Sequence, residues 1–308
     1  MTDPVDRSPI VVGVDGSTSA MHAVRWAARE AGRRQASLLL VHASAVIPVP
    51  THSGVTLPRS FDEAMRDRGA RWLSEAAAMA EEAAPGVPVR TELTTRFPAE
   101  QLIGLSASAE LVVLGSRGLG GFTGLLVGSI AVAVATHGHC PLVVVRGDAF
   151  ETSKTSEADE DAGAEPLADR PVIVGVDGSR TSDAAVSFAF EAAASRRASL
   201  VAVHTWMDIA LGFGWEAVDW ERTEAQTDAQ LTEWLATARE RYPEVPVRRV
   251  VAQDRPANTL LAQAENAQLV VVGSRGRGGF RGLLLGSTSQ ALIYHSPCPV
   301  AVVPLPRQ

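Results

Sequence analysis

Two glycine-rich stretches of this chain have the composition and spacing of loops that hold an anion. The first, GSRGLGGFTGLLVGS, spans residues 115–129 and follows the apolar run 111–114, which is typical of a buried strand. The second, GSRGRGGFRGLLLGS, spans residues 273–287. Glycine lets backbone N–H groups approach a ligand closely, and successive N–H groups form a concave anion site. We therefore expect both loops to bind phosphate groups through the backbone.

The end of each loop adds helix amides to this predicted anion site. Gly-Ser closes both loops where a helix is expected, and free N–H groups at a helix N-terminus favour negative charge. One helix dipole contributes only about 0.3–1 kcal/mol near the surface, so several amides must act together. Neither G-x-x-x-x-G-K-[ST] nor G-x-G-x-x-G occurs, and the single lysine is Lys154. The pattern that does occur twice is G-x₂-G-x₉-G-S, formed by Gly115, Gly118, Gly128 and Ser129 and again by Gly273, Gly276, Gly286 and Ser287.

An aspartate precedes each loop in the repeated stretch VGVDGS, at residues 12–17 and 174–179. Asp15 and Asp177 each follow a short β-branched run, so each lies where a strand should end. Each aspartate could contact a ligand there, or could serve as a turn or helix-capping residue before the glycine. The two roles are compatible.

Arginines give the two loops different charges. Arg117 and Arg275 occupy the same position in both copies, where they could pair with phosphates or be solvated. The second copy also has Arg277 and Arg281, where the first has uncharged residues. We therefore predict that the second site binds its ligand more tightly.

The glycine motif and VGVDGS, each present twice, resemble the universal stress protein family in its tandem two-domain form. The resemblance covers both halves of the chain. It implies an α/β fold with one ATP site per domain, any Mg²⁺ held through the phosphates, and no metal bound by side chains. It places Asp15 and Asp177 near adenine and ribose, and the loops near ribose and triphosphate. In the first domain the implied binding residues are Gly13, Asp15, Gly115, Ser116, Arg117, Gly118, Leu119, Gly120, Gly121, Gly128, Ser129 and Ile130. In the second they are Gly175, Asp177, Gly273, Ser274, Arg275, Gly276, Arg277, Gly278, Gly279, Gly286, Ser287, Thr288 and Ser289, with Asp208 as a further candidate after the second strand.

The repeated motifs also predict the domain organisation. VGVDGS and the glycine-rich motif both recur, in the same order, at a period of about 160 residues. This period suits a duplicated domain and is too long for a solenoid repeat. Residues 147–170 between the copies are acidic, small and polar, which is typical of a linker. We expect a first universal stress protein domain at 1–147, an acidic linker at 148–170 and a second domain at 171–308.

Strand and helix signals alternate within each copy. In the first copy we expect strands at 10–14, 38–41, 87–93, 111–114 and 142–145, and helices after Ser17 or Ser19 and at 61–84, 98–108 and 129–137. Several strands are continuous apolar runs, which indicates a parallel sheet covered on both faces. The predicted fold is α/β, with two tandem Rossmann-like domains that each have a five-stranded parallel sheet between helix layers.

Composition excludes several classes of protein. A net charge of −7 argues against nucleic acid as a partner, because phosphate backbones need a basic face. No apolar run approaches the roughly 20 residues of a membrane span, and the first residues do not resemble a signal peptide. Cys140 and Cys298 cannot form a disulfide framework, so we expect buried reduced thiols and a cytoplasmic protein.

The histidines of this chain do not indicate a metal site or a catalytic site. HGHC at 137–140 aligns with HSPC at 295–298, so one histidine is repeated and a helix end is favoured over a metal site. We expect His42 and His204, at equivalent strand ends, to lie in the core or in a pocket wall.

The expected role is that of a binding protein. No Glu or His is repeated beside the glycine loops to orient a water for phosphoryl transfer, so we expect at most weak ATP hydrolysis. We expect a nucleotide-dependent stress-response protein that forms a homodimer and could act through an unidentified protein partner. The copies are expected to meet through the last strand of each. A slow ATPase and a scaffold with structural nucleotide remain alternatives, and cyclic AMP is an alternative ligand because the same pocket would accept its adenine.

Overall fold

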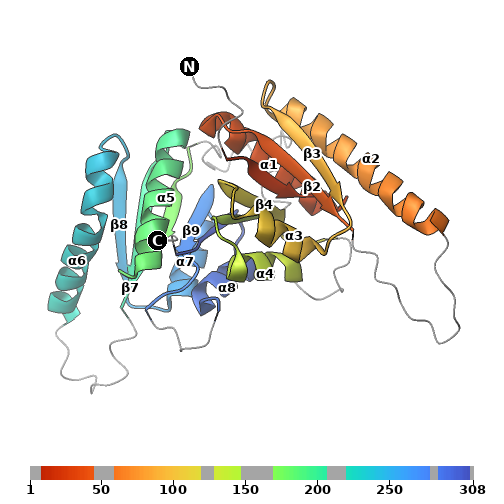
Figure 1. Ribbon diagram of the computed structural model, residues 1–308. Coiled ribbons are helices and arrows are strands. Elements are labelled where there is room, and N and C mark those ends of the chain that lie inside the picture. Colours follow the sequence, from red (N-terminus) through yellow and green to blue (C-terminus); the bar gives the residue numbers. More distant parts are fainter. Residues whose placement is uncertain are drawn as a thin grey trace, which may run out of the picture. The chain divides into compact units, whose positions relative to one another are not determined.

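The fold is described from a computed structural model, which covers residues 8–44, 59–118, 128–146, 169–206, 220–277 and 284–305. The chain separates into two compact units, Met1–Gly147 and Asp148–Gln308 (Figure 1). The expected linker lies outside the described residues, apart from its last two.

The first unit alternates strands and helices along the chain. Its elements are β1 (Ile10–Gly13), α1 (Thr18–Arg34), β2 (Leu38–Ala43), α2 (Arg59–Ala83), β3 (Val89–Thr94), α3 (Pro98–Leu105), β4 (Leu111–Gly115), α4 (Ser129–His137) and β5 (Leu142–Val145). Its strands are parallel and lie in the order β3-β2-β1-β4-β5.

The second unit repeats this plan. Its elements are β6 (Val172–Gly175), α5 (Arg180–Arg196), β7 (Leu200–Thr205), α6 (Trp220–Arg241), β8 (Val247–Ala252), α7 (Pro256–Ala264), β9 (Leu269–Gly273), α8 (Ser287–His295) and β10 (Val300–Val303). Its strands are also parallel, in the order β8-β7-β6-β9-β10. The predicted fold class is therefore confirmed in both halves.

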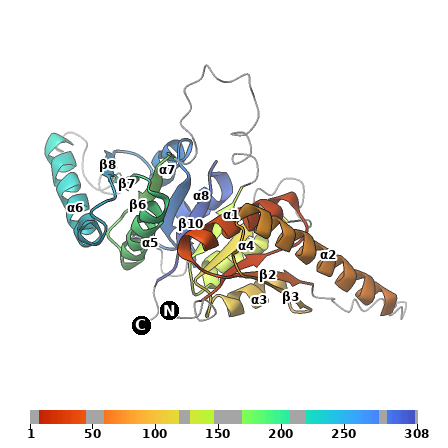
Figure 2. The ribbon, with the colours of Figure 1, turned by 90° about the horizontal axis from the view of Figure 1, so that it is seen from above.

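The strands β1, β4, β5, β6, β9 and β10 are apolar because helices cover both faces of each sheet, whereas the edge strands β3 and β8 carry polar residues. In the first unit α1 packs with α2, and α3 packs with α4. Figure 2 shows α1 and α2 on the opposite side of β2 from α3. Ile10, Leu38 and Leu111 are fully buried in neighbouring strands, and their register partners continue this core. Burying one such side chain contributes roughly 1.5–3 kcal/mol.

Local signals in the sequence set the ends of the first helix in each unit. Of the two expected caps, Ser17 is the N-cap of α1, since its hydroxyl accepts a hydrogen bond from the Ala20 N–H at 3.1 Å. Ser179 does the same for α5 with Ser182 at 3.2 Å. Both helices end at a residue in the left-handed conformation. The helix expected at 98–108 ends at Leu105, because the chain turns there before β4.

None of the helices in the described part of the chain combines the length and the apolar character that a membrane crossing requires.

Candidate functional site

The repeated motifs meet at the carboxyl ends of the central strands. In the first unit β1 pairs with β2 on one side and β4 on the other, so the strand order reverses between β1 and β4. Ligands of open parallel sheets bind at this switch point. β6 and β9 form the same point in the second unit.

In the first domain the first residues of the glycine loop contact the N-terminus of α1. The Ser17 hydroxyl donates to Asp15 Oδ1 at 2.6 Å and is 3.2 Å from the Arg117 carbonyl. The Arg117 N–H donates to the Ser19 hydroxyl at 3.3 Å. A Cβ at Gly118 would overlap Asp15 Oδ2. The loop backbone therefore runs against the strand-one aspartate, and glycine is required for that approach.

The second domain repeats this contact with a direct bond between loop and aspartate. Asp177 accepts from the Ser179 N–H at 2.9 Å and from the Arg277 N–H at 2.9 Å. The Thr181 hydroxyl donates to the Arg275 carbonyl. A Cβ at Gly276 would overlap Asp177 Oδ2. Asp15 and Asp177 thus act in the turns, which is one of the two expected roles, and both lie beside the loop. Contact with a ligand, the other expected role, stays a prediction.

The first glycine of each loop also lies against the helix. A Cβ at Gly115 would lie 2.6 Å from the carbonyl carbon of Ser19. The corresponding Cβ at Gly273 would lie 2.9 Å from Thr181 Cβ and 3.0 Å from the Thr181 backbone. A side chain in either place would push the helix away from the sheet.

The last glycine of each loop starts a helix without a side-chain cap. Gly128 is the N-cap of α4 and Gly286 that of α8, and neither helix has a side-chain hydrogen bond at its N-terminus. The Gly128 N–H donates to the Ser116 carbonyl at 3.0 Å, and the Gly286 N–H donates to the Ser274 carbonyl at 2.8 Å. These bonds hold the end of each loop next to the residue that follows the strand. Ser289 donates to the Gly273 carbonyl at 2.7 Å, while Ser129, Ile130, Ser287 and Thr288 form the first turns. The first-turn amides therefore lie beside the strand ends.

Some predicted residues stand apart from this geometry. Gly13 and Gly175 lie at the ends of β1 and β6, where a Cβ would contact apolar side chains of the neighbouring strand and of the helix before that strand. Leu119, Gly120, Gly121, Asp208, Gly278 and Gly279 lie outside the described residues.

Two tryptophans at this edge were not predicted from the sequence. Trp72 of α2 lies against Gly16, whose φ is +81°, and its ring centroid is 5.2 Å from that of His42. Trp234 of α6 lies against Gly178, with φ +71°, and its ring centroid is 5.2 Å from that of His204. The available signal was that both repeats have tryptophan at one equivalent helix position. The helix faces could not be aligned without the sheet.

The two histidines belong to the walls of this region, as expected. The His42 Nδ1 lies 2.7 Å from the Val14 carbonyl, and the residue is only 5% exposed. His204 Nδ1 lies 2.6 Å from the Val176 carbonyl. Burial lowers the pKa of His204, and the positive charge of Arg277 lowers it further. The His204 ring is therefore neutral at pH 7.

The cysteines lie at the start of the last strand of each domain. Cys298 is buried, while Cys140 is only partly buried, which corrects the expectation of a fully buried thiol. Burial raises the pKa of both thiols from 9.0 to about 12. Among the residues that the structure describes, no three His, Cys, Asp or Glu side chains are grouped to hold a metal.

We predict that both thiols react slowly with Ellman's reagent at pH 8. A thiol with pKa near 12 has roughly a thousandth of the thiolate of one with pKa near 9. Rates in the native protein and in urea provide the comparison, and equal rates would contradict the prediction. Because folding raises the thiol pKa, the associated stability is present below pH 9 and is lost as pH rises from 9.0 to about 12.

Known proteins are similar to this chain in both sequence and fold. The sequence model described as the universal stress protein family matches residues 7–146 and 170–304. A universal stress protein of Mycobacterium tuberculosis is 39% identical over 297 residues, which is 95% of each chain. One of Mycobacterium bovis is 36% identical over 305 residues, covering 98% of this chain and 99% of the relative. The crystal structure of a universal stress protein from Archaeoglobus fulgidus covers 97% of this chain and 99% of that one, with a TM-score of 0.65 and 21% identity, and it has the same fold.

Proposed function

Because the chain belongs to the universal stress protein family, with one copy of the family domain in each half, we propose that each domain binds one molecule of ATP. The protein then acts as a nucleotide-dependent regulator in a stress response, through its conformation or its choice of partner. A homodimer and a cytoplasmic location belong to the same proposal.

The observation that carries this proposal is the contact between glycine loop and strand-one aspartate in both domains. The loop amide of Arg277 donates to Asp177, and in the first domain Gly118 lies against Asp15. A carboxylate and a row of backbone amides then face the same edge of the sheet. The carboxylate suits the hydroxyls and amino group of a nucleoside, whereas the amides suit phosphates.

The described residues also fit a phosphate chain without lysine. The first turns of α4 and α8 have no side-chain cap, so their N–H groups can donate to an anion. Arg117 and Arg275 lie two residues after the ends of β4 and β9 and supply positive charge beside these amides. Bound Mg²⁺ would be held by phosphate oxygens and would neutralise part of their charge.

Calorimetry tests the proposal directly. We expect ATP with Mg²⁺ to titrate to two molecules per chain, and nucleotide released from the purified protein to contain adenine. Mass spectrometry of the released material distinguishes ATP from cyclic AMP. Absence of binding by ATP and by cyclic AMP would overturn the proposal and favour a scaffold.

Hydrolysis separates a regulator from an ATPase. Phosphoryl transfer requires an oriented water and charge stabilisation at the γ-phosphate. Neither glycine loop has a Glu or His repeated beside it in the sequence. We expect the γ-phosphate of bound ATP to remain intact for hours, and multiple turnovers in that time would instead identify an enzyme.

A further inference from the structure

In the second domain, Arg277 joins the glycine loop to the strand-one turn and to a tryptophan of α6. Its guanidinium donates to the Gly178 carbonyl at 3.4 Å, and its backbone N–H bonds to Asp177. The guanidinium carbon lies 4.8 Å from the centroid of the Trp234 ring. Arg277 is exposed, so a planar ligand beside Asp177 can reach the guanidinium from solvent. A guanidinium stacks on flat aromatic faces, and a nucleobase presents such a face.

The first domain covers its tryptophan differently. The guanidinium carbon of Arg68, one helical turn before Trp72 in α2, lies 4.6 Å from the Trp72 ring centroid. The loop residue that aligns with Arg277 is Leu119, which lies outside the described residues. Leucine offers neither charge nor a planar group, so this loop position cannot supply a stacked guanidinium.

The first domain instead has an additional arginine beside the start of its loop. Gly115 pairs with Val145, and the Ser116 N–H donates to the Val145 carbonyl at 2.9 Å. Arg146 therefore lies beside the first residues of the loop. Burial lowers the pKa of Arg146, and the nearby positive charge of Arg117 lowers it further. Two guanidinium groups that repel each other are stabilised by an anion between them.

The second domain has the same backbone register here but not the same charge. Gly273 pairs with Val303, and the Ser274 N–H donates to the Val303 carbonyl at 2.8 Å. The next residue is Pro304, in the place of Arg146. The two domains thus carry their additional cations on different segments of one shared geometry: Arg146 follows the last strand of the first domain, whereas Arg277 lies within the loop of the second.

We propose that the two sites differ in ligand selectivity: the first depends on the phosphates, through Arg117 and Arg146, and the second depends on the base, through Arg277 stacked on Trp234. This inference rests on the proposed function, because it assigns selectivity to the same two sites. The first domain discriminates strongly among ATP, AMP and adenosine. The second retains adenosine far better, because stacking does not require phosphate.

Single-site proteins make the comparison possible. Gly276→Val blocks the second site and leaves the first, and Gly118→Val does the reverse, since either side chain would overlap the facing aspartate. Each protein is titrated with ATP, AMP and adenosine after circular dichroism has shown an unchanged fold. For the first site we expect at least a hundredfold preference for ATP over adenosine. For the second we expect a preference of roughly tenfold or less, since base stacking supplies much of the affinity.

Arginine variants test the assigned residues. In the protein with only the second site, Arg277→Leu and Arg277→Lys should both weaken adenosine binding on the order of tenfold, because lysine keeps the charge but loses the planar stack. In the protein with only the first site, Arg146→Gln should weaken ATP on the order of tenfold and leave adenosine unchanged, while Arg146→Lys retains most ATP affinity.

The possible results separate this inference from the function on which it rests. If both sites bind ATP but rank the three ligands alike, the selectivity proposal is wrong and the proposed function stands. The same conclusion follows if Arg277→Lys binds adenosine as the parent protein does, because charge alone would then act. If neither single-site protein nor the parent binds any of the ligands, the proposed function fails, and this inference fails with it.

Discussion

Alanine in place of Gly118 or Gly276 should weaken ATP binding in its own domain at least about tenfold, or ~1.4 kcal/mol, and leave the other domain unchanged. Each glycine lies where a Cβ would overlap the carboxylate of Asp15 or Asp177. The loop or the aspartate must move to make room for the new side chain. The loop amides and the carboxylate would then no longer be placed to contact the same ATP molecule. Calorimetry on each variant should show one site at the parent affinity and one weakened site.

A matched glycine provides the control for this prediction. Gly104 in α3 is exposed, and a Cβ there would meet no atom within 4 Å. Gly104→Ala should leave both sites unchanged and stabilise the helix slightly, because alanine is the better helix former. Gly118→Val should have a larger effect than Gly118→Ala, since the branched side chain cannot be accommodated by a small shift. Full ATP affinity in both Gly118 variants would show that the loop does not form the site.

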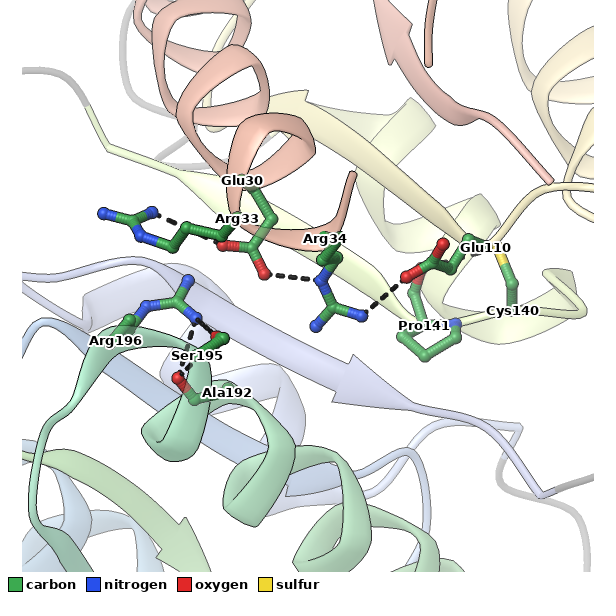
Figure 3. Close-up of polar contacts among 9 residues, drawn as sticks. All are labelled: Glu30, Arg33, Arg34, Glu110, Cys140, Pro141, Ala192, Ser195 and Arg196. Atoms are coloured by element: carbon green, nitrogen blue, oxygen red, sulfur yellow. Dashed lines mark hydrogen bonds and ion pairs between the residues drawn. The ribbon is translucent and has the colours of Figure 1, made fainter. Parts of the chain in front are cut away.

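Methionine in place of Arg34 should destabilise the first domain by about 3–5 kcal/mol, because it leaves a buried carboxylate without its main partner. Glu30 is completely buried, and its Oε1 lies 2.6 Å from Arg34 Nε, while Arg34 Nη1 lies 2.8 Å from Glu110 Oε1 (Figure 3). The Arg34 side chain is only 6% exposed, so water cannot replace it. Native-state hydrogen exchange read by mass spectrometry measures each domain separately, and protection in β1 and β4 should fall.

Two further variants test whether this loss of stability comes from leaving the Glu30 carboxylate buried without Arg34. Arg33 also pairs with Glu30, but at 3.5 Å and with 36% of its side chain exposed, so Arg33→Met should cost less than about 1 kcal/mol. Replacing Glu30 by leucine together with Arg34→Met should recover most of the loss, because an apolar pair needs no compensating charge. The second domain has alanine at the position of Glu30, and Arg196 there donates to the Ala192 carbonyl at 3.0 Å (Figure 3). Protection in Arg34→Met equal to that in Arg33→Met would contradict the prediction.

The fold and the position of the candidate site followed largely from local sequence signals. Apolar runs such as 111–114 have to be buried on both faces, which requires a parallel sheet between helices. Helix starts followed from Ser17 and Pro98, because capping and a fixed φ act over a few residues. The duplicated motifs placed the loop residues at strand ends without knowledge of any long-range contact.

Other contacts, at the sites and in the core, join residues far apart in the chain, and local sequence patterns could not predict them. Trp72 and His42 come from a helix and a strand, and their meeting depends on how α2 packs on β2. Helical periodicity predicts the Glu30–Arg34 spacing, but it would assign a charged pair to the solvent face. Its burial and the third partner Glu110 depend on the position of α1 over the sheet.

The sequence by itself therefore determined the repeat, the strand and helix types, and the position of each motif at a strand end, because each is set by residues close together in the chain. Only the tertiary structure decided that each loop meets the strand-one aspartate, that Arg277 lies on Trp234 and that Arg146 lies beside the first residues of its loop. Such contacts join segments far apart in sequence. They are fixed by strand register and helix packing, which depend on the whole core at once.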